Sequence, residues 1–295
     1  MATDRMEASE KTFVFSFDLE KALAFPKLTT SVAYYKRNVY LYNFGCHDLN
    51  KNISHMFIWP ESEGSRGAQE ISSCLIKYIK THAKNAEKLI TYSDSCPGQN
   101  KNIKIVLSLL KLVQSSEITA ESIEMKFLVS GHSYLPNDSD FAIIESHAKK
   151  IQNIFSPDDW YNIIKTCKKK VPFNLNKMTH KDFFSTKPLE NSINNRKVTV
   201  TGLPINWLKM RWIKLERCKP HIIQFKCDYN KDSEFNAINI RKSVVGRPQY
   251  LKNINLPLLY PKGRTVSKEK KRDIMNLLKY IPSDKHDYYK NLTTD

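Results

Sequence analysis

Hydrophobic and polar positions recur in a regular order along the first half of the chain. Alternation of aromatic and β-branched residues predicts strands over residues 12–17, 32–35, 39–44, 53–59, 89–93 and 123–129. Helical spacing of apolar residues predicts helices over residues 65–81, from residue 103 to about residue 113, and over residues 141–151. A meander of strands followed by strand–helix units predicts an α/β fold, in which helices flank a mixed sheet.

The second half has shorter and weaker patterns. Pro157 opens a predicted helix that runs to the lysine cluster ending at Lys170. Ser267 is a good N-cap for a last helix over residues 267–280. Between them, the pattern predicts short strands of a small sheet or barrel at residues 197–200, 207–216, 222–227 and 237–240.

The composition is that of an ordinary globular protein. The chain has 295 residues, of which 41% are hydrophobic. No apolar run approaches the ~18 residues that a membrane helix needs, and the start lacks an apolar signal region. The six cysteines include no closely spaced pair, which is typical of free thiols in a reducing compartment. We therefore expect a nuclear or cytoplasmic protein without a membrane partner.

The surplus of positive charge is confined to the second half. Residues 1–148 contain 16 Lys and Arg against 17 Asp and Glu, a net charge of −1, whereas residues 149–295 contain 31 against 13, a net charge of +18. Such asymmetry favours a half that binds a polyanion beside a nearly neutral half with an acidic pocket. We expect nucleic acid as the partner, with DNA as the expected form.

Four acids stand at the ends of strands or near the starts of helices: Asp18, Glu70, Asp94 and Asp140. Two carboxylates ~4–5 Å apart repel by roughly 3–4 kcal/mol at an effective dielectric of about 20, so a cluster of them requires a cation. Alternatives exist for two of the positions. They are Glu61 and Glu63 in place of Glu70, and Asp138 and Glu145 in place of Asp140.

Two segments have side chains suited to nucleic acid. The turn after Asp94 contains Gln99, Asn100 and Lys101 just before a predicted helix, whose first backbone N–H groups favour a phosphate. In the second half, alternation along a strand would place Trp207, Lys209 and Arg211 on one face. Aromatic residues among cations are typical of stacking on bases with contacts to phosphates.

These acids, in this order of elements, resemble the ribonuclease H-like superfamily, which includes ribonuclease H, retroviral integrases and DDE transposases. In that fold the four acids lie at the end of strand one, in the first helix, at the end of strand four and in the helix after strand five. The segment from Val129 through His132 to Asp140 is similar to the ribonuclease H loop that carries a histidine before its final aspartate. The resemblance covers residues 12–152.

The phrases at residues 92–102 and 127–141 also resemble a group of insect and other animal proteins derived from mobile elements. Members of that group often carry extra sequence before the first strand, so we do not expect autonomous transposition. The helix that ends at the lysine cluster before residue 171 predicts a domain boundary there, and we expect three parts of the chain. They are a ribonuclease H-like domain at residues 11–155, a helical connector at residues 156–170 and a smaller basic α+β domain at residues 171–295.

The chemistry implied by the resemblance is two-metal phosphoryl transfer with Mg²⁺ or Mn²⁺ as cofactor. Asp18 and Asp94 would be shared ligands, Glu70 would hold one ion or orient water, and Asp140 would complete the other site. His132 would assist proton transfer or product release. The sequence thus predicts a transposon-derived metal-dependent nuclease or polynucleotidyl transferase. The alternative is a catalytically silent descendant that only binds nucleic acid.

Overall fold

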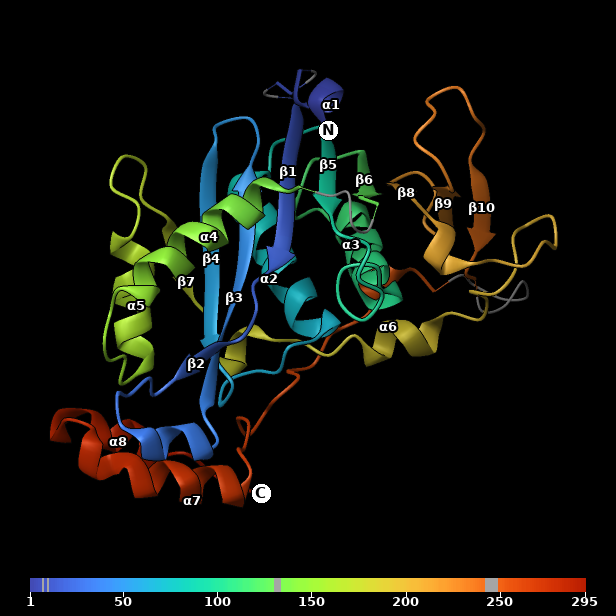
Figure 1. The fold of residues 1–295 in the computed structure, drawn as a ribbon. Coiled ribbons are helices and arrows are strands. Elements are labelled where there is room, and N and C mark those ends of the chain that lie inside the picture. The colour runs from blue at the N-terminus through green and yellow to red at the C-terminus, as the bar shows by residue number, and fades with distance from the viewer. Residues whose placement is uncertain (7, 10, 130–133, 242–248) are drawn as a thin grey trace.

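Figure 1 shows the computed structural model, which describes residues 1–6, 8–9, 11–129, 134–241 and 249–295. The strands are β1 (Thr12–Leu19), β2 (Leu23–Phe25), β3 (Val39–Asp48), β4 (Ile53–Pro60), β5 (Lys88–Ser93), β6 (Ser122–Phe127), β7 (Asn174–Lys177), β8 (Trp212–Glu216), β9 (Ile222–Lys226) and β10 (Asn236–Asn239). The helices are α1 (Ala2–Met6), α2 (Ala68–His82), α3 (Ile103–Gln114), α4 (Pro136–Lys149), α5 (Pro157–Thr166), α6 (Lys187–Ser192), α7 (Lys268–Leu277) and α8 (His286–Lys290). Short 3-10 turns include η1 (Ser31–Tyr35) and η3 (Trp207–Lys209).

All of these strands belong to one mixed sheet with the order β10-β9-β8-β6-β5-β1-β3-β4-β7, and β2 pairs with β3. At its centre β1, β3 and β4 form an antiparallel meander, whereas β5 and β6 run parallel to β1. The predicted α/β class, a mixed sheet flanked by helices, is confirmed.

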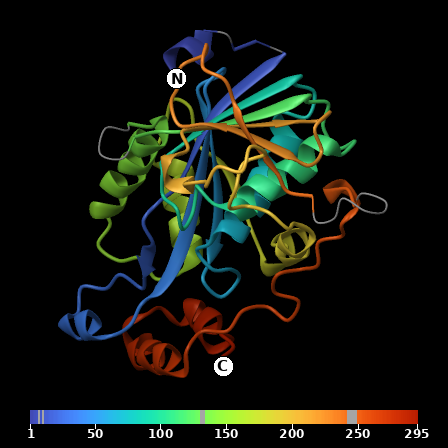
Figure 2. The ribbon, with the colours of Figure 1, turned by 90° about the vertical axis from the view of Figure 1, so that its right-hand side faces the viewer.

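Helices cover both faces of this sheet, as the edge-on view in Figure 2 shows. The α2 and α3 face packs on the odd-numbered residues of β1, including Phe15 and Phe17. The opposite face is covered by α4 and α5, whose Phe141 and Trp160 join a second core cluster. Because side chains alternate along a strand, the even-numbered residues of β1 point toward the α4 face. That face receives Asp18.

Three of the predicted strands are replaced or shortened in the structure. Residues 32–35 lie in η1, where Tyr34 and Tyr35 are exposed, so their β propensity has no neighbouring strand to act on. Residues 197–200 form only an isolated bridge between Val198 and Pro204. Residues 207–209 make η3, because the side chain of Asn206 accepts a hydrogen bond from Leu208 N and starts a turn. The strand expected over residues 207–216 therefore begins at Trp212.

The described strands of the second half join the sheet of the first half, and the expectation of a small separate sheet or barrel is wrong. Strand β8 pairs antiparallel with β6, so β8, β9 and β10 extend the sheet at one edge, while β7 extends it beyond β4. An unpaired edge presents free N–H and C=O groups, and the C-terminal strands satisfy them here. The division into residues 11–155, 156–170 and 171–295 as folding units stays a prediction.

Two whole-chain expectations can be compared with the structure directly. All six cysteines are free, as predicted from their spacing. Among the helices of the described residues, none has the length and apolar character needed to cross a membrane.

The docking of α4 on β1 and β3 depends on Gly45. A Cβ at Gly45 would lie 2.9 Å from Phe141 Cε1 and 3.2 Å from Asn137 Nδ2, so only glycine lets the helix approach this closely. Asn137 then accepts from Ser16 Oγ at 2.6 Å and donates to Gly45 O at 3.0 Å. These contacts fix the first turn of α4 beside the end of β1.

We expect Gly45→Ala to destabilise the protein by about 1–3 kcal/mol, because the added methyl group overpacks the contact with Phe141. Urea unfolding monitored by circular dichroism measures this change. Gly98→Ala is the matched control, since a Cβ at Gly98 meets no atom within 4 Å. Equal stability of the two variants would contradict the proposed role of Gly45.

Candidate active site

Two of the predicted acids come together at the ends of neighbouring parallel strands. Ser16 of β1 lies opposite Tyr92 of β5, and Asp18 and Asp94 each follow two residues later. The same Nδ2 group of Asn100 donates to Asp18 Oδ1 at 3.1 Å and to Asp94 Oδ1 at 2.6 Å. A single amide therefore bridges the two carboxylates, as the strand-end reasoning anticipated for this pair.

The electrostatics of this pair show how close the charges are. Burial, and after it the charge of Asp94, raises the pKa of Asp18 to about 6. Hydrogen bonds from the Leu19 backbone and from Asn100 oppose this shift, and the charge of Asp138 adds to it. Asp138 lies in the first turn of α4, where its Oδ2 accepts from Leu135 N at 2.7 Å. The local field therefore involves three carboxylates.

Asp140, which the sequence favoured over Asp138, has other partners. Its Oδ2 accepts from Ser54 Oγ at 2.7 Å and lies 2.8 Å from His47 Nδ1, while Lys168 Nζ donates to Oδ1 at 3.3 Å. Burial raises the pKa of Asp140, but the hydrogen bonds of His47 and Ser54 and the charge of Lys168 outweigh it and keep the pKa below its usual value. This buried network ties α4 to β3 and β4.

Glu70 is likewise engaged by its own surroundings. It is buried in the first turn of α2, where Oε1 accepts from Ser65 N at 3.0 Å and from the hydroxyl group of Tyr260. These bonds close the loop before α2 and join it to the C-terminal half. In the described part of the chain, no hydrogen bond or ion pair connects Glu70 with the acid pair.

The remaining alternative acids form ion pairs. Glu61 lies 2.6 Å from Lys270 Nζ, and Glu63 Oε2 lies 2.7 Å from His180 Nδ1. Glu145 of α4 pairs with Lys21 at 2.5 Å. Each carboxylate already has a basic side chain as its partner, which weakens its case as a metal ligand. His132 lies outside the described residues.

The segment after Asp94 folds into a tight loop that carries Asn100. Cys96 N donates to Asp94 Oδ1 at 3.1 Å, and Lys101 N donates to Cys96 O at 2.9 Å. Arg211 Nη1 donates to Ser95 Oγ at 3.1 Å and holds the loop from the side of β8. The buried Asn100 is thereby fixed between the two carboxylates, and its Oδ1 has no hydrogen-bond partner among the described residues.

The residues predicted to bind nucleic acid divide into two groups. Lys101 is buried, and its Nζ donates to Leu208 O at 3.1 Å and to Met210 O at 2.7 Å. Burial and the nearby charge of Arg211 lower the pKa of Lys101 to about 8. Lys101 and Arg211 thus stabilise the loop, whereas Lys209 is exposed and Gln99 and Trp207 are partly exposed.

One titratable residue beside the pair escaped the sequence reasoning. Burial raises the pKa of Glu20 to about 8, although Asn43 Nδ2 donates to its Oε2 at 2.8 Å. Glu20 Oε1 has no hydrogen-bond partner in the part of the chain that the structure describes. The sequence contains a signal that could have identified Glu20. It follows Asp18 by two residues and so continues the same alternation along the chain.

Within the described ranges, no group of three or more His, Cys, Asp and Glu side chains is placed to hold a metal ion. The acid pair nevertheless provides two carboxylates and, in Asn100 Oδ1, one buried amide oxygen without a partner. Hard oxygen donors of this kind suit Mg²⁺, which proteins usually hold through one or two carboxylates together with substrate phosphates.

Comparison with protein families places much of this chain in one family. The model of a family described as a domain of unknown function (DUF7869) matches residues 44–234. The matched region contains Asp94, Asn100 and Asp138, and Asp18 precedes it. No curated protein matches the chain.

We expect Asp18→Asn to stabilise the metal-free protein at pH 8 and to change its stability little at pH 4. A folded pKa of about 6 exceeds the usual 3.8, so the stability contribution of Asp18 is present below pH 3.8 and is lost as the pH rises through 6. The gain at pH 8 is about 1–3 kcal/mol, since one pKa unit corresponds to about 1.4 kcal/mol.

Urea unfolding in EDTA at both pH values measures this gain. Glu234→Gln, which changes an exposed carboxylate elsewhere, is the matched control. A gain of the same size at pH 4 and pH 8 would show that repulsion at the pair is not its cause.

Proposed function

Because the chain belongs to the family of the domain of unknown function DUF7869, which supplies no activity, we propose a function from the site itself: a metal-dependent nuclease or polynucleotidyl transferase that acts on phosphodiester bonds of nucleic acid. The observation that carries this proposal is the pair Asp18 and Asp94, bridged by Asn100 at the carboxyl ends of β1 and β5. Ligands of open α/β sheets bind at such strand ends.

The topology supports a ribonuclease H-like fold as part of this proposal. The central order β4-β3-β1-β5-β6, with an antiparallel meander followed by two parallel strands, places the first acid at the end of the first strand of the meander. If the short β2 is left aside, Asp94 follows the fourth strand and Asp138 opens the helix after the fifth. These are the positions that the resemblance implies for three of the four acids.

Asp18 and Asp94 would hold Mg²⁺ or Mn²⁺ in place of the Asn100 Nδ2 group that now bridges them, and Asp138 adds negative charge from α4. A bound divalent cation would supply charge neutralisation for the phosphate and for the attacking and leaving oxygens. The chain's own contribution is positional. Parallel pairing of β1 and β5 fixes the spacing of the two carboxylates, and the buried Asn100 amide keeps them together when no cation is present.

A second candidate function is nucleic-acid binding without cleavage. It is favoured by the hydrogen bonds that Glu70 and Asp140 already accept. Ser65 N donates to Glu70, and Ser54 Oγ donates to Asp140. The net charge of +18 in residues 149–295 would remain useful in such a descendant. The two candidates differ in whether the acid pair responds to a divalent cation.

The test is cleavage of plasmid DNA, single-stranded DNA and an RNA–DNA hybrid by the full chain in MgCl₂ or MnCl₂. We expect metal-dependent cleavage that Asp18→Asn and Asp94→Asn each reduce by more than about 100-fold, because outer-shell partners alone are worth roughly 10- to 100-fold at metal sites. MnCl₂ should also raise the melting temperature of the wild-type protein and not that of Asp94→Asn.

Glu145→Gln is the matched control, since Glu145 lies on α4 but pairs with Lys21. It should keep both the cleavage and the response to MnCl₂. Absence of cleavage together with nucleic-acid affinity that falls steeply with salt would support the second candidate instead. Cleavage that persists unchanged in Asp94→Asn would overturn the assignment of the site.

A further inference from the structure

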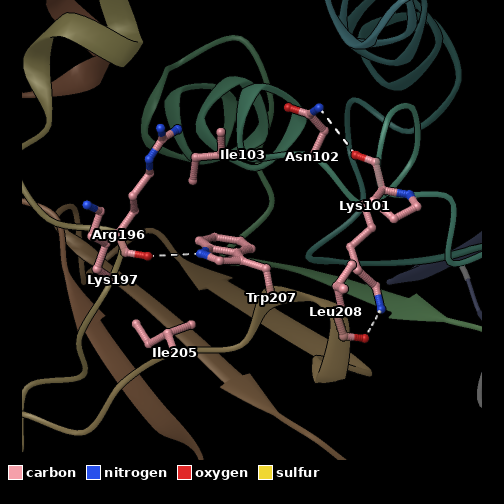
Figure 3. Close-up of a pocket in the computed structure, with 9 residues that line it drawn as sticks. Lys101, Asn102, Ile103, Arg196, Lys197, Ile205, Trp207 and Leu208 are labelled. Carbon is pink, nitrogen blue, oxygen red and sulfur yellow. Dashed lines mark hydrogen bonds between the residues drawn. The ribbon is translucent and has the colours of Figure 1, made fainter.

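A groove of about 540 Å³ lies between the start of α3 and the segment of residues 196–208 (Figure 3). This volume is within the range of roughly 300–1,000 Å³ that is typical of ligand sites. Both halves of the chain contribute to its wall. The lining residues are Pro97, Lys101, Asn102, Ile103, Arg196, Lys197, Ile205, Trp207 and Leu208.

Trp207 provides a flat aromatic surface in this groove. Its Nε1 donates to Arg196 O at 2.9 Å, which fixes the orientation of the ring. Figure 3 shows the indole lying between Ile103 and Ile205. The chain's other tryptophans are Trp59, Trp160 and Trp212, and all three are buried, whereas Trp207 is partly exposed. An exposed ring held in one orientation by its own hydrogen bond suits stacking.

The polar groups around the ring favour an anion. Arg196 and Lys197 are exposed, and the structure gives Lys197 Nζ no ion pair with a described acid. The groove also meets the N-terminal end of α3, where Asn102 is the N-cap and the helix dipole is positive. None of the lining residues among those described is acidic. The groove therefore combines an aromatic face with positive potential.

The groove is joined to the acid pair by two adjacent residues of one loop. Asn100 bridges Asp18 and Asp94, and the next residue, Lys101, lines the groove and donates to Leu208 O and Met210 O. The loop after Asp94 therefore contributes one residue to the acid pair and the next residue to the groove.

We propose that this groove binds an unpaired nucleotide of a nucleic-acid strand, next to the phosphodiester bond addressed by Asp18 and Asp94. The base stacks on Trp207, and the flanking phosphates contact Arg196 and Lys197. The occupant is unpaired because a base within a duplex has both faces covered by its neighbours, whereas a single strand can offer a face to an aromatic side chain. This inference rests on the proposed function for its choice of substrate.

The test uses the full chain in EDTA, so that binding is measured without cleavage. A 12-nucleotide oligothymidylate, the matching oligouridylate, a DNA duplex of the same length and thymidine monophosphate are the probes. We expect either single strand to quench tryptophan fluorescence and to bind more tightly than the duplex and the mononucleotide. Trp207→Ala should weaken binding of the labelled single strand by about ten-fold, within the range for loss of one base–aromatic stack, and Trp207→Phe by much less.

Two controls separate stacking from general effects. Trp160→Phe removes a buried tryptophan and should leave the quenching unchanged. Arg196→Gln with Lys197→Gln should lower the slope of log affinity against log salt by about 1.4, since each phosphate contact on a single strand contributes roughly 0.7. Lys165→Gln with Lys169→Gln removes two exposed lysines on and after α5 and should lower the slope by less.

The outcomes distinguish this inference from the proposed function. Equal affinity of wild type and Trp207→Ala, or equal binding of duplex and single strand, overturns the groove assignment even if the protein cleaves DNA through Asp94. Equally tight binding of thymidine monophosphate also overturns it, because the occupant is then a free nucleotide. Selective binding that requires Trp207, found in a protein that never cleaves, supports the groove and refutes the nuclease.

Discussion

The structure of this site depends on two like charges being held together. Asp18 and Asp94 stand at the ends of adjacent parallel strands, and the Asn100 amide donates to both. Burial, and after it the charge of Asp94, raises the pKa of Asp18, so its ionised form is disfavoured when no cation is bound. The large cores on the two faces of the sheet determine how the strands pair. That register in turn places the two carboxylates at neighbouring strand ends, even though their ionised forms are unfavourable there.

The supporting shell is specific on both sides of the pair. On one side, Gly45 lets α4 approach β3, and Asn137 then fixes the first turn that carries Asp138. On the other side, the loop bearing Asn100 is held by Arg211. When the side chains of a site lie at strand ends and the residues around them are fixed by packing, those side chains are held more precisely than they would be on flexible loops. This is the kind of preorganisation that phosphodiester chemistry needs.

Apart from residues 32–35 and the short β2, the sequence predicted the order of elements in residues 12–151, because alternation along a strand and helical spacing are local signals. The pairing of Asp18 with Asp94 was implied by the resemblance. The sequence favoured Asp140 over Asp138 because the helix was expected to begin at residue 141, whereas α4 begins at Pro136. The partners of Asp140 and Glu70 come from distant segments, for example Ser54 and Tyr260, and no local pattern reveals such contacts. The same holds for Lys101. Its position before a helix suggested a contact with nucleic acid, but its ammonium group donates to the backbone carbonyl groups of Leu208 and Met210.

The charge asymmetry acquires a physical meaning once the second half is seen to join the same sheet. Since β8 pairs with β6, residues 196–211 are brought beside the loop that follows Asp94. Some basic side chains there are structural. The ammonium group of Lys101, for example, donates to a backbone carbonyl group and is not available to a ligand. Arg196 and Lys197 are exposed and available, and they flank the partly exposed Trp207. Asn100 contacts the acid pair and the adjacent Lys101 lines the basic groove, so one loop contributes to both features and joins the first half of the chain to the second.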